Sequence, residues 1–217
     1  MYDLANLIGK YLPEDPVIIE AGACDGTDTL AISQIWPRAK IYAFEPNPKS
    51  YQMLIKKIGS NENIHPFNIA IGNKNGFSDF YLCKQSHVSE EEDMGDPSSI
   101  LPPCMDKFGS NIRFEKPIQV PIMDLDTWAE QNQIKAIDFM WLDMQGSEGA
   151  MLQACPKILQ TVKAIQTEYF SSPYYKGTML RNDLYSFLQK NGFKQIFHYG
   201  NASGDLIFVR ETFTDLS

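Results

Sequence analysis

The chain has 217 residues, with 27 acidic residues against 19 lysines and arginines, a net charge of −8 and an isoelectric point near 4.9. This acidic balance argues against a protein that holds nucleic acid by its phosphates, because that mode of binding requires a basic face. No apolar stretch reaches the length of a membrane span, and the N-terminus lacks the basic flank and apolar run of a signal peptide. We therefore expect a cytoplasmic protein without a membrane span or a nucleic-acid partner.

The four cysteines lie far apart and lack the spacing of a metal site, so we expect reduced thiols and no disulfide framework. The length fits one domain, residues 1–217. Within it, apolar residues recur at helical spacing before Pro13, which predicts an N-terminal helix in residues 1–14, packed across a sheet edge. Residues 84–111 carry an acidic run and several prolines without a clear period, and we expect an active-site loop or lid there.

From residue 17 onward, the hydrophobic pattern alternates between the period of strands and the period of helices. Such alternation predicts an α/β fold with a mostly parallel sheet and helices on both faces. The last two strands, 193–199 and 204–210, are joined by a glycine-containing turn, which predicts an antiparallel hairpin. The other expected strands are 17–21, 40–44, 64–69, 77–83, 118–123, 136–142 and 163–169, and the expected helices are 27–35, 48–58, 124–132, 147–160 and 178–190.

The most informative motif is VIIEAGACDG at residues 17–26, in which Glu20 precedes a glycine loop. The next strand ends in Glu45. In open α/β sheets, ligands bind outside the carboxyl ends of the strands, and an acid at the end of the second strand accepts both ribose hydroxyls of a bound nucleoside. The two motifs therefore predict a nucleoside-cofactor site. The alternative is a tight strand-to-helix turn without a ligand.

The glycine loop also indicates which cofactor to expect. It lacks the middle glycine of the G-x-G-x-x-G frame, which brings backbone amides to a pyrophosphate, and this disfavours an NAD-linked protein. Glu20 and Asp25 would repel a diphosphate, whereas they suit a ligand with an ammonium or a sulfonium charge. S-adenosyl-methionine carries both charges, so we expect it as the cofactor.

A second cluster, residues 137–148, places Asp143 at the end of the fourth central strand, just before a glycine turn and a helix. This position lies over the same crevice as Glu20 and Glu45, where three acids suit a cationic ligand. As an alternative, Asp143 caps the following helix, because backbone amides and the helix dipole favour an acid there.

Several motifs together carry a resemblance to a known family. They are Glu-x-Gly-Ala-x-x-Gly, Phe-Glu-Pro-Asn, Asn-x-Ala-Ile-Gly, Ser-Ser, Leu-Asp-x-Trp and Asp-Phe-x-x-x-Asp-x-x-Gly-x-Glu, in this order. From about residue 15 to residue 210, the chain resembles the FkbM family of S-adenosyl-methionine-dependent methyltransferases. The resemblance implies the class I methyltransferase fold (Rossmann-like), with a seven-stranded sheet that ends in an antiparallel hairpin. It also implies O-methylation of hydroxyls on sugars, glycolipids or polyketide-type products.

The resemblance further implies roles for single residues. Asp143 matches the acid that faces both cofactor and acceptor. Trp141 and Gln145 depart from the family pattern, in which a Lys and a Glu are usual, so we do not transfer family roles to these two positions. The expected cofactor contacts are Glu20, Gly22, Ala23 and Gly26 at the methionine part, Glu45 at the ribose, Pro46 and Asn47 at the adenosine side, Asn68, Ala70, Ser98 and Ser99 nearby, and Asp25 and Thr27 in and after the glycine loop.

Methyl transfer to an alcohol needs a group that accepts the hydroxyl proton as attack proceeds. We expect this base to be Asp143 with Glu168, which ends the fifth central strand. His198 in the closing hairpin is a further candidate for the base. The alternative is that it packs beside its aromatic neighbours. The aromatic residues of 169–175 either stack on a sugar ring or cover the sheet edge.

We therefore expect an O-methyltransferase that acts on a hydroxyl of a small molecule, sugar or glycan. A lipid, a polyketide-type product, a protein or RNA is the alternative acceptor, and the sequence leaves the oligomeric state open. No metal site is expected, although Asp124, Asp126 and Asp143 offer the oxygen ligands that a hard cation prefers. Asp124 is better interpreted as a helix cap.

Overall fold

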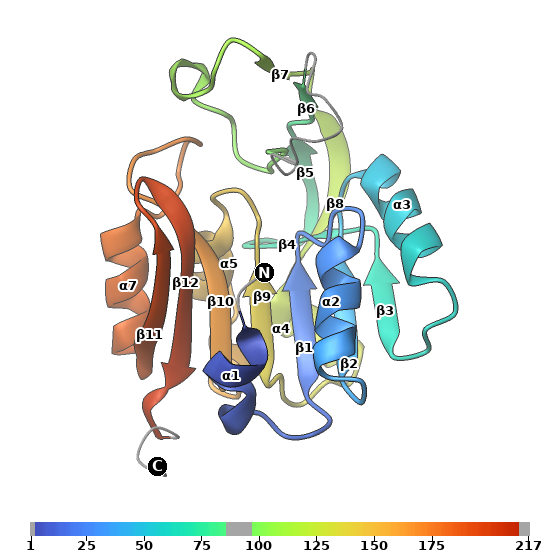
Figure 1. The fold of residues 1–217 in the computed structure, drawn as a ribbon. Helices are drawn as coiled ribbons and strands as arrows, with labels where there is room; N and C mark the ends of the chain where they lie inside the picture. Colours follow the sequence, from blue (N-terminus) through green and yellow to red (C-terminus); the bar gives the residue numbers. More distant parts are fainter. Residues whose placement is uncertain (1–2, 86–96, 213–217) are drawn as a thin grey trace.

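The computed structural model of the protein describes residues 3–85 and 97–212, so residues 86–96 of the expected loop lie outside the described part. Its centre is a seven-stranded sheet in the order β11-β12-β10-β9-β1-β2-β3 (Figure 1). Neighbouring strands run parallel, except that β12 pairs antiparallel with β10 and β11. The predicted sheet and its C-terminal hairpin are therefore confirmed. The strands are β1 (Val17–Ala21), β2 (Lys40–Phe44), β3 (Ile64–Phe67), β9 (Phe139–Leu142), β10 (Ala164–Phe170), β11 (Phe193–Gly200) and β12 (Ser203–Arg210).

Helices cover both faces of this sheet, as the alternating pattern predicts (Figure 1). None of the helices in residues 3–85 and 97–212 has the length and apolar character that crossing a membrane requires. One face carries α1 (Leu4–Ile8), the 3-10 helix η1 (Gly9–Tyr11), α2 (Thr27–Ile35) and α3 (Pro48–Ile58), and the other carries α4 (Leu125–Gln131), α5 (Glu148–Ala154), α6 (Pro156–Leu159) and α7 (Arg181–Lys190).

The N-terminal helix lies on a face of the sheet and not across its edge, which corrects the expectation for residues 1–14. Leu4 and Ile8 of α1 are fully buried in a core that includes Ile18 of β1 and Ile207 of β12. Burying each such side chain contributes roughly 1.5–3 kcal/mol relative to leaving it exposed. The face offers more apolar surface than the edge, so the amphipathic segment binds there.

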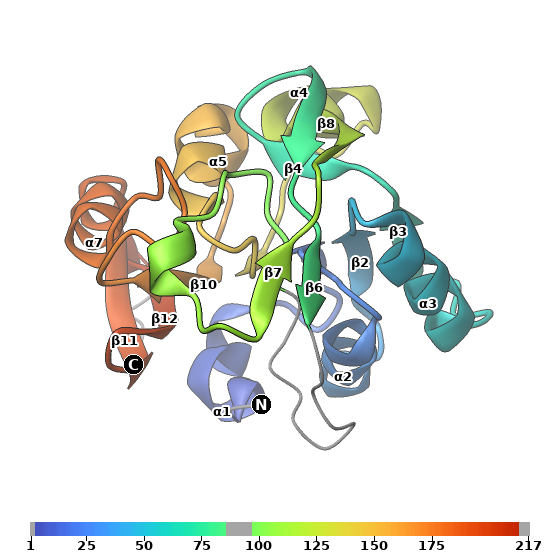
Figure 2. The same ribbon diagram turned by 90° about the horizontal axis from the view of Figure 1, so that it is seen from above.

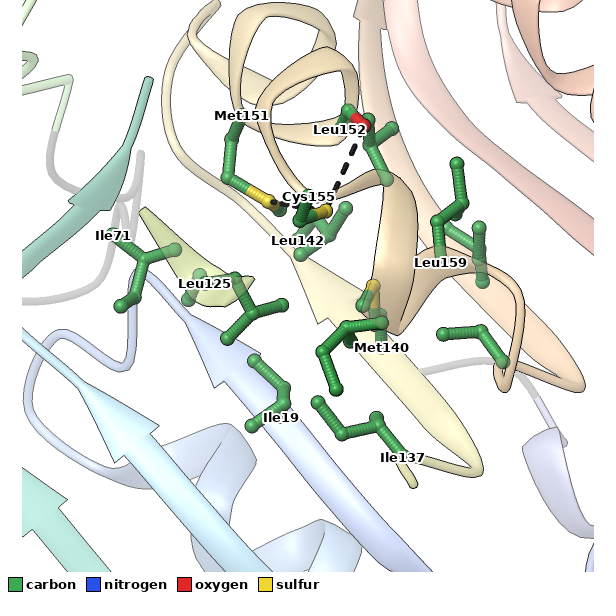
Figure 3. Close-up of a cluster of buried hydrophobic side chains, with 14 of the residues drawn as sticks. Ile19, Ile71, Leu125, Ile137, Met140, Leu142, Met151, Leu152, Cys155 and Leu159 are labelled. Atoms are coloured by element: carbon green, nitrogen blue, oxygen red, sulfur yellow. Dashed lines mark hydrogen bonds between the residues drawn. The ribbon is translucent and has the colours of Figure 1, made fainter. Parts of the chain in front are cut away.

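On the opposite face, aliphatic and sulfur-containing side chains join the sheet to α4, α5 and α6 (Figure 3). Ile19 from β1 and Met151 from α5 are both fully buried in this core. The predicted helix 147–160 is divided here, because Cys155 has φ −122° and ψ 52° and separates α5 from α6. Pro156 follows it, and a proline disfavours the helical conformation in the residue before it.

Two smaller sheets stand above the carboxyl ends of the central strands (Figure 1). Seen from above, the β6–β7 pair lies across the middle of the molecule (Figure 2). One sheet has the order β4-β8-β5, formed by β4 (Ala70–Gly72), β8 (Ile118–Asp124) and β5 (Gly76–Phe80), and the other pairs β6 (Cys83–Gln85) with β7 (Ile112–Phe114), with the 3-10 helix η2 (Met105–Lys107) between them in the chain.

The small sheets explain where the strand predictions failed. The predicted strand 64–69 ends at Phe67, because the next two residues lead the chain out of the central sheet and into β4. The predicted strand 77–83 is likewise divided into β5 and β6. Asp124 caps α4 as predicted, since its carboxylate accepts a hydrogen bond of 2.8 Å from the amide of Thr127.

Candidate active site

A cavity of about 530 Å³ lies between the carboxyl ends of β1, β2 and β9 and the small β4-β8-β5 sheet. This volume is typical of a small-molecule site. Of the predicted site residues, its lining contains Gly22, Ala23, Asp25, Thr27, Glu45, Pro46, Ala70, Ser98 and Asp143. The other predicted site residues lie outside the lining, and they are Glu20, Gly26, Asn47, Asn68, Ser99, Glu168 and His198.

The glycine loop and the loop after β9 meet at the bottom of this cavity. Gly22 has φ +93°, and a Cβ atom there would lie 1.7 Å from the carbonyl oxygen of Asp143. The amide of Asp143 donates a hydrogen bond of 2.9 Å to the carbonyl of Ala21. At Gly26, with φ +85°, a Cβ atom would lie 2.7 Å from Leu54 Cδ1 of α3. Gly22 therefore requires glycine for close packing as well as for conformation, whereas at Gly26 the left-handed conformation is the stronger requirement, because a flexible leucine side chain can move aside.

Glu45 is fixed in place at the end of β2. Its Oε2 accepts a hydrogen bond of 2.8 Å from the amide of Cys24, and its Oε1 accepts one of 2.6 Å from the amide of Asn47. Asn68 supports the same turn, because its side-chain amide donates to the carbonyls of Glu45 at 2.8 Å and Pro46 at 3.2 Å. The carboxylate is thus held in a fixed orientation at the cavity, which it lines.

Asp25 is engaged by other residues of the protein. It forms a salt bridge with Lys57 of α3 and accepts hydrogen bonds from the amide and hydroxyl of Thr27, at 3.0 and 2.7 Å. Burial alone would raise the pKa of Asp25, but the hydrogen bonds from Lys57 and Thr27 outweigh it and lower the pKa. The charge of Asp25 was expected to face a cationic ligand. In the structure, Lys57 already pairs with that charge.

Glu20 lies beneath the cavity and is only 1% exposed. Neither of its carboxylate oxygens has a partner within hydrogen-bonding geometry among the described residues. The same holds for the nearby Thr29 hydroxyl on α2, which is also buried. Burial raises the pKa of Glu20 to about 8; the nearby Thr29 hydroxyl opposes this shift, and the charges of Asp28, Glu45 and Asp143 add to it. A buried acid without a partner is suited to a positively charged neighbour.

Asp143, which lines the cavity, and Glu168, which does not, form a carboxyl pair. Gln145 bridges them, since its Nε2 donates to Asp143 Oδ1 at 2.8 Å and to Glu168 Oε2 at 3.1 Å. The Asp143 side chain is open to the cavity, yet the surrounding protein removes enough water to raise its pKa to about 6. Burial and then the charge of Asp143 raise the pKa of Glu168 well above its ordinary value.

The interpretation of Asp143 as a helix cap is not supported, because Ser147 is the N-cap residue of α5 and no side chain makes a capping hydrogen bond there. The turn before the helix is instead held by Glu148. Oε1 of Glu148 accepts hydrogen bonds from the amides of Met144 at 2.7 Å and Gly146 at 3.2 Å. Neither Glu148 nor the bridging Gln145 is among the predicted site residues. The final Glu of the Asp-x-x-Gly-x-Glu motif was the signal available for Glu148.

The two predicted serines belong to the roof of the cavity, which Phe80, Cys83 and residues 97–100 form, and only Ser99 connects the roof to the floor. Ser98 Oγ accepts a hydrogen bond of 2.8 Å from the amide of Cys83. Ser99 Oγ donates one of 2.8 Å to the carbonyl of Gln145 in the turn after β9. Ser98 lines the cavity, whereas Ser99 is buried behind it. Ser99 therefore acts on the site through the position of the turn.

His198 is placed away from the carboxyl pair. Its Nε2 lies 2.7 Å from the hydroxyl of Tyr169, and its register partner Leu206 belongs to the core on the α7 face. Aromatic residues of 169–175 pack against the segment between η2 and β7, with Phe108 edge-on to Tyr174 and Tyr175. This contact favours a covering role for these rings over a stacking platform.

The three aspartates that were considered for a cation are not brought together. Asp124 caps α4, and the carboxylate of Asp126 accepts hydrogen bonds from the amides of Lys157 and Ile158 at 3.0 and 2.8 Å. Asp143 lines the cavity instead. Residues 3–85 and 97–212 contain no group of three or more side chains arranged to hold a metal ion.

Comparison with known proteins identifies the family. Residues 20–194 match the family described as the methyltransferase FkbM domain. The chain belongs to this family. A relative in Sinorhizobium fredii (strain NBRC 101917 / NGR234), named 2-O-methyltransferase NoeI, is 30% identical over 166 residues, which cover 76% of this chain and 68% of the relative. Methyltransferase sdnD of Sordaria araneosa is 41% identical over 61 residues, or 28% of this chain and 22% of the relative.

Solved structures of methyltransferases share the fold. The N-terminal domain of EvdMO1, crystallised in the presence of S-adenosyl-homocysteine and D-fucose, aligns with a TM-score of 0.53 and 13% identity, over 96% of this chain and 81% of that one. Aeropyrum pernix fibrillarin with bound S-adenosyl-methionine aligns with a TM-score of 0.50 and 14% identity, over 95% of this chain and 73% of that one. This FkbM-family protein therefore has the class I methyltransferase fold. It is a methyltransferase with S-adenosyl-methionine as its cofactor.

Proposed function

We propose that the protein is an O-methyltransferase that transfers the methyl group of S-adenosyl-methionine to a hydroxyl of a sugar or glycan. The observation that carries this proposal is the Asp143 carboxyl, which is open to the cavity and hydrogen-bonded within a carboxyl pair. An alcohol oxygen must lose its proton as it attacks, and a carboxylate at that position accepts it. The similarity to a relative named 2-O-methyltransferase supports a hydroxyl acceptor.

We assign the cofactor to the floor of the cavity. Glu45 would accept the ribose hydroxyls, because two backbone amides already orient it. Glu20, buried without a partner among the described residues, would stabilise the ammonium end of the methionine part. Gly22 and Ala23 would allow the cofactor to approach the backbone. When bound, S-adenosyl-methionine supplies an electrophilic methyl group on its sulfonium.

The protein then has three tasks in the reaction. The roof residues, including Ser98, exclude water from the cavity. The loop after β9 aligns the acceptor oxygen with the reacting group, which supplies much of the rate enhancement by proximity. Asp143 accepts the hydroxyl proton during attack. The charges that act most strongly on this pair are carboxylates, a setting that suits a neutral or cationic acceptor better than an anionic one.

The test is a transfer assay with methyl-labelled S-adenosyl-methionine against three separate pools: fucose-containing oligosaccharides, an RNA mixture and a peptide mixture. We expect label in the oligosaccharide pool, with a gain of one methyl group on a sugar hydroxyl by mass spectrometry. Oligosaccharides that lack the 2-hydroxyl, used in parallel, show whether this position is the acceptor. Label in the RNA or peptide pool alone would overturn the proposal.

A further inference from the structure

Gln145 occupies the junction between the cavity floor and its roof. Its side-chain nitrogen contacts the carboxyls of Asp143 and Glu168, at 2.8 and 3.1 Å. Its side-chain oxygen lies 3.1 Å from the hydroxyl of Tyr175, which shares its proton with the carbonyl of Pro97 at 2.7 Å. The amide oxygen is thus taken up by a phenol, and the amide nitrogen is turned toward the two acids.

The backbone holds this side chain in an unusual conformation. Gln145 has φ +53°, which is uncommon for a residue with a Cβ atom, and Gly146 follows with φ +96°. The Ser99 hydroxyl donates to the Gln145 carbonyl at 2.8 Å and anchors the turn. A strained residue persists only where its surroundings over-determine it, and such residues concentrate at functional sites.

The electrostatic surroundings give the amide a specific task. Burial is the largest influence on both Asp143 and Glu168, and the neighbouring charges that follow are carboxylates. Two adjacent carboxyls cannot both ionise at low cost, so such a pair shares a proton. The titratable groups that surround the pair include Glu20 on β1, Asp28 on α2, Glu148 on α5, Asp205 on β12 and the Tyr175 phenol.

We propose that Gln145 is a positioning residue whose amide, oriented by Tyr175, holds Asp143 as the carboxylate that faces the acceptor while Glu168 keeps the shared proton. This inference rests on the proposed function. Both hydrogens of Nε2 are used, because one is donated to each acid. Tyr175 also donates to the carbonyl of Pro97, which lines the cavity. The same hydroxyl therefore links the roof of the cavity to Gln145 and, through Gln145, to Asp143.

A titration that needs no acceptor tests this proposal. The side-chain carboxyl carbons of Asp and Glu are labelled with ¹³C and followed by NMR from acid to alkaline pH, in the full chain with S-adenosyl-homocysteine bound. Asp143→Asn and Glu168→Gln assign the two resonances. We expect two coupled steps, with Asp143 losing its proton first. In Gln145→Met, the step of Asp143 should move up by about one pH unit or more, because the carboxylate loses a hydrogen-bond donor.

Two further variants separate positioning from folding. Tyr175→Phe keeps the amide but removes the hydroxyl that orients it, and a smaller upward shift is expected. Gln119→Met is the matched control, since Gln119 also donates to a carboxylate, Asp79, on the distant β8–β5 pair. It should leave both steps unchanged. Binding of S-adenosyl-homocysteine and the melting temperature verify that each variant is folded.

The proposal is overturned if Asp143 and Glu168 titrate independently near ordinary values, or if folded Gln145→Met and Tyr175→Phe both keep the wild-type curve. Failure of the methyl-transfer assay on sugars would leave this titration unaffected. The two proposals can therefore fail separately.

Discussion

Gly22 and Asp143, which are far apart in the sequence, approach so closely that a Cβ atom on Gly22 would lie 1.7 Å from the Asp143 carbonyl oxygen. The loop that we assign to the cofactor therefore rests directly on the residue that we assign as the base. A side chain at position 22 must push these two loops apart, because backbone atoms cannot rotate away as a flexible side chain does.

Gly22→Ala is expected to weaken binding of S-adenosyl-homocysteine by about 5- to 150-fold, since forcing an extra methyl into a packed site costs about 1–3 kcal/mol. Isothermal titration calorimetry measures the affinity. Gly177→Ala is the matched control, because Gly177 has φ +89° and a Cβ atom added there would have no neighbour within 4 Å. Similar losses in the two variants would show that conformational strain, and not contact with Asp143, is responsible.

Glu45→Ala should reduce the affinity for S-adenosyl-methionine by about 10- to 100-fold, because hydrogen bonds to a charged group contribute about 1.5–3 kcal/mol each. Glu45→Gln should lose less, since it keeps one acceptor oxygen. Isothermal titration calorimetry measures the affinity, and NAD, which should not bind, is titrated as the negative control. Glu62→Ala, at an exposed position after α3, should bind as the wild type does. Unchanged affinity in Glu45→Ala would remove Glu45 from the cofactor site.

Asp143→Asn should lower kcat by about 10²–10⁴-fold, the range that general-base catalysis contributes. Affinity for S-adenosyl-homocysteine should stay within about threefold, because asparagine keeps the size of the side chain. Asp79→Asn, on the exposed side of β5, serves as the control. A normal kcat in Asp143→Asn would assign proton transfer to another group.

The pH profile of kcat/KM should fall on the acid side near pH 6, because the pKa of Asp143 is raised to about 6 and the base must be ionised. An Asp with an ordinary pKa would place this limb about two units lower. Rates measured between pH 4.5 and 8, with saturating cofactor, test the prediction. A flat profile down to pH 5 would contradict it.

Glu20 should make the protein without cofactor less stable as the pH rises. Its pKa is about 8 in the folded state against 4.5 as the reference, so the folded state binds more protons between these values. The free energy of unfolding therefore falls from about pH 4.5 to pH 8, by about 2–4 kcal/mol for this group.

Glu20→Gln should remove that loss and raise the free energy of unfolding more at pH 8 than at pH 5. Urea unfolding at both values measures the difference, with Glu62→Gln as the exposed counterpart. An equal effect of Glu20→Gln at pH 5 and pH 8 would mean that Glu20 keeps an ordinary pKa.

The sequence predicted the central fold because its signals are local. Strands β1, β2, β9 and β10 each read as a short apolar run, and a polar or glycine-containing turn follows it. Parallel strands place their carboxyl ends at one edge, so Glu45 and Asp143 could be expected near each other before any distance was known. The hairpin of β11 and β12 could be predicted from the glycine-containing turn between the two strands.

Other features depend on contacts between distant parts of the chain. Asp25 pairs with Lys57, and Gln145 bridges Asp143 and Glu168. The hydrophobic period of the sequence does not indicate that these segments lie close together. The division of the predicted strand 64–69 is similar, because β4 leaves the central sheet to pair with β8, a strand that comes much later in the chain.

The sequence by itself therefore determined the strands of the central sheet, the glycine loop and the acids at the strand ends, since these follow from local periodicity and turn chemistry. Only the tertiary structure decided which acid is paired with a lysine, which is buried without a partner among the described residues and which two are bridged by an amide. Those properties depend on burial and on the distances between charges, and both arise when the chain packs.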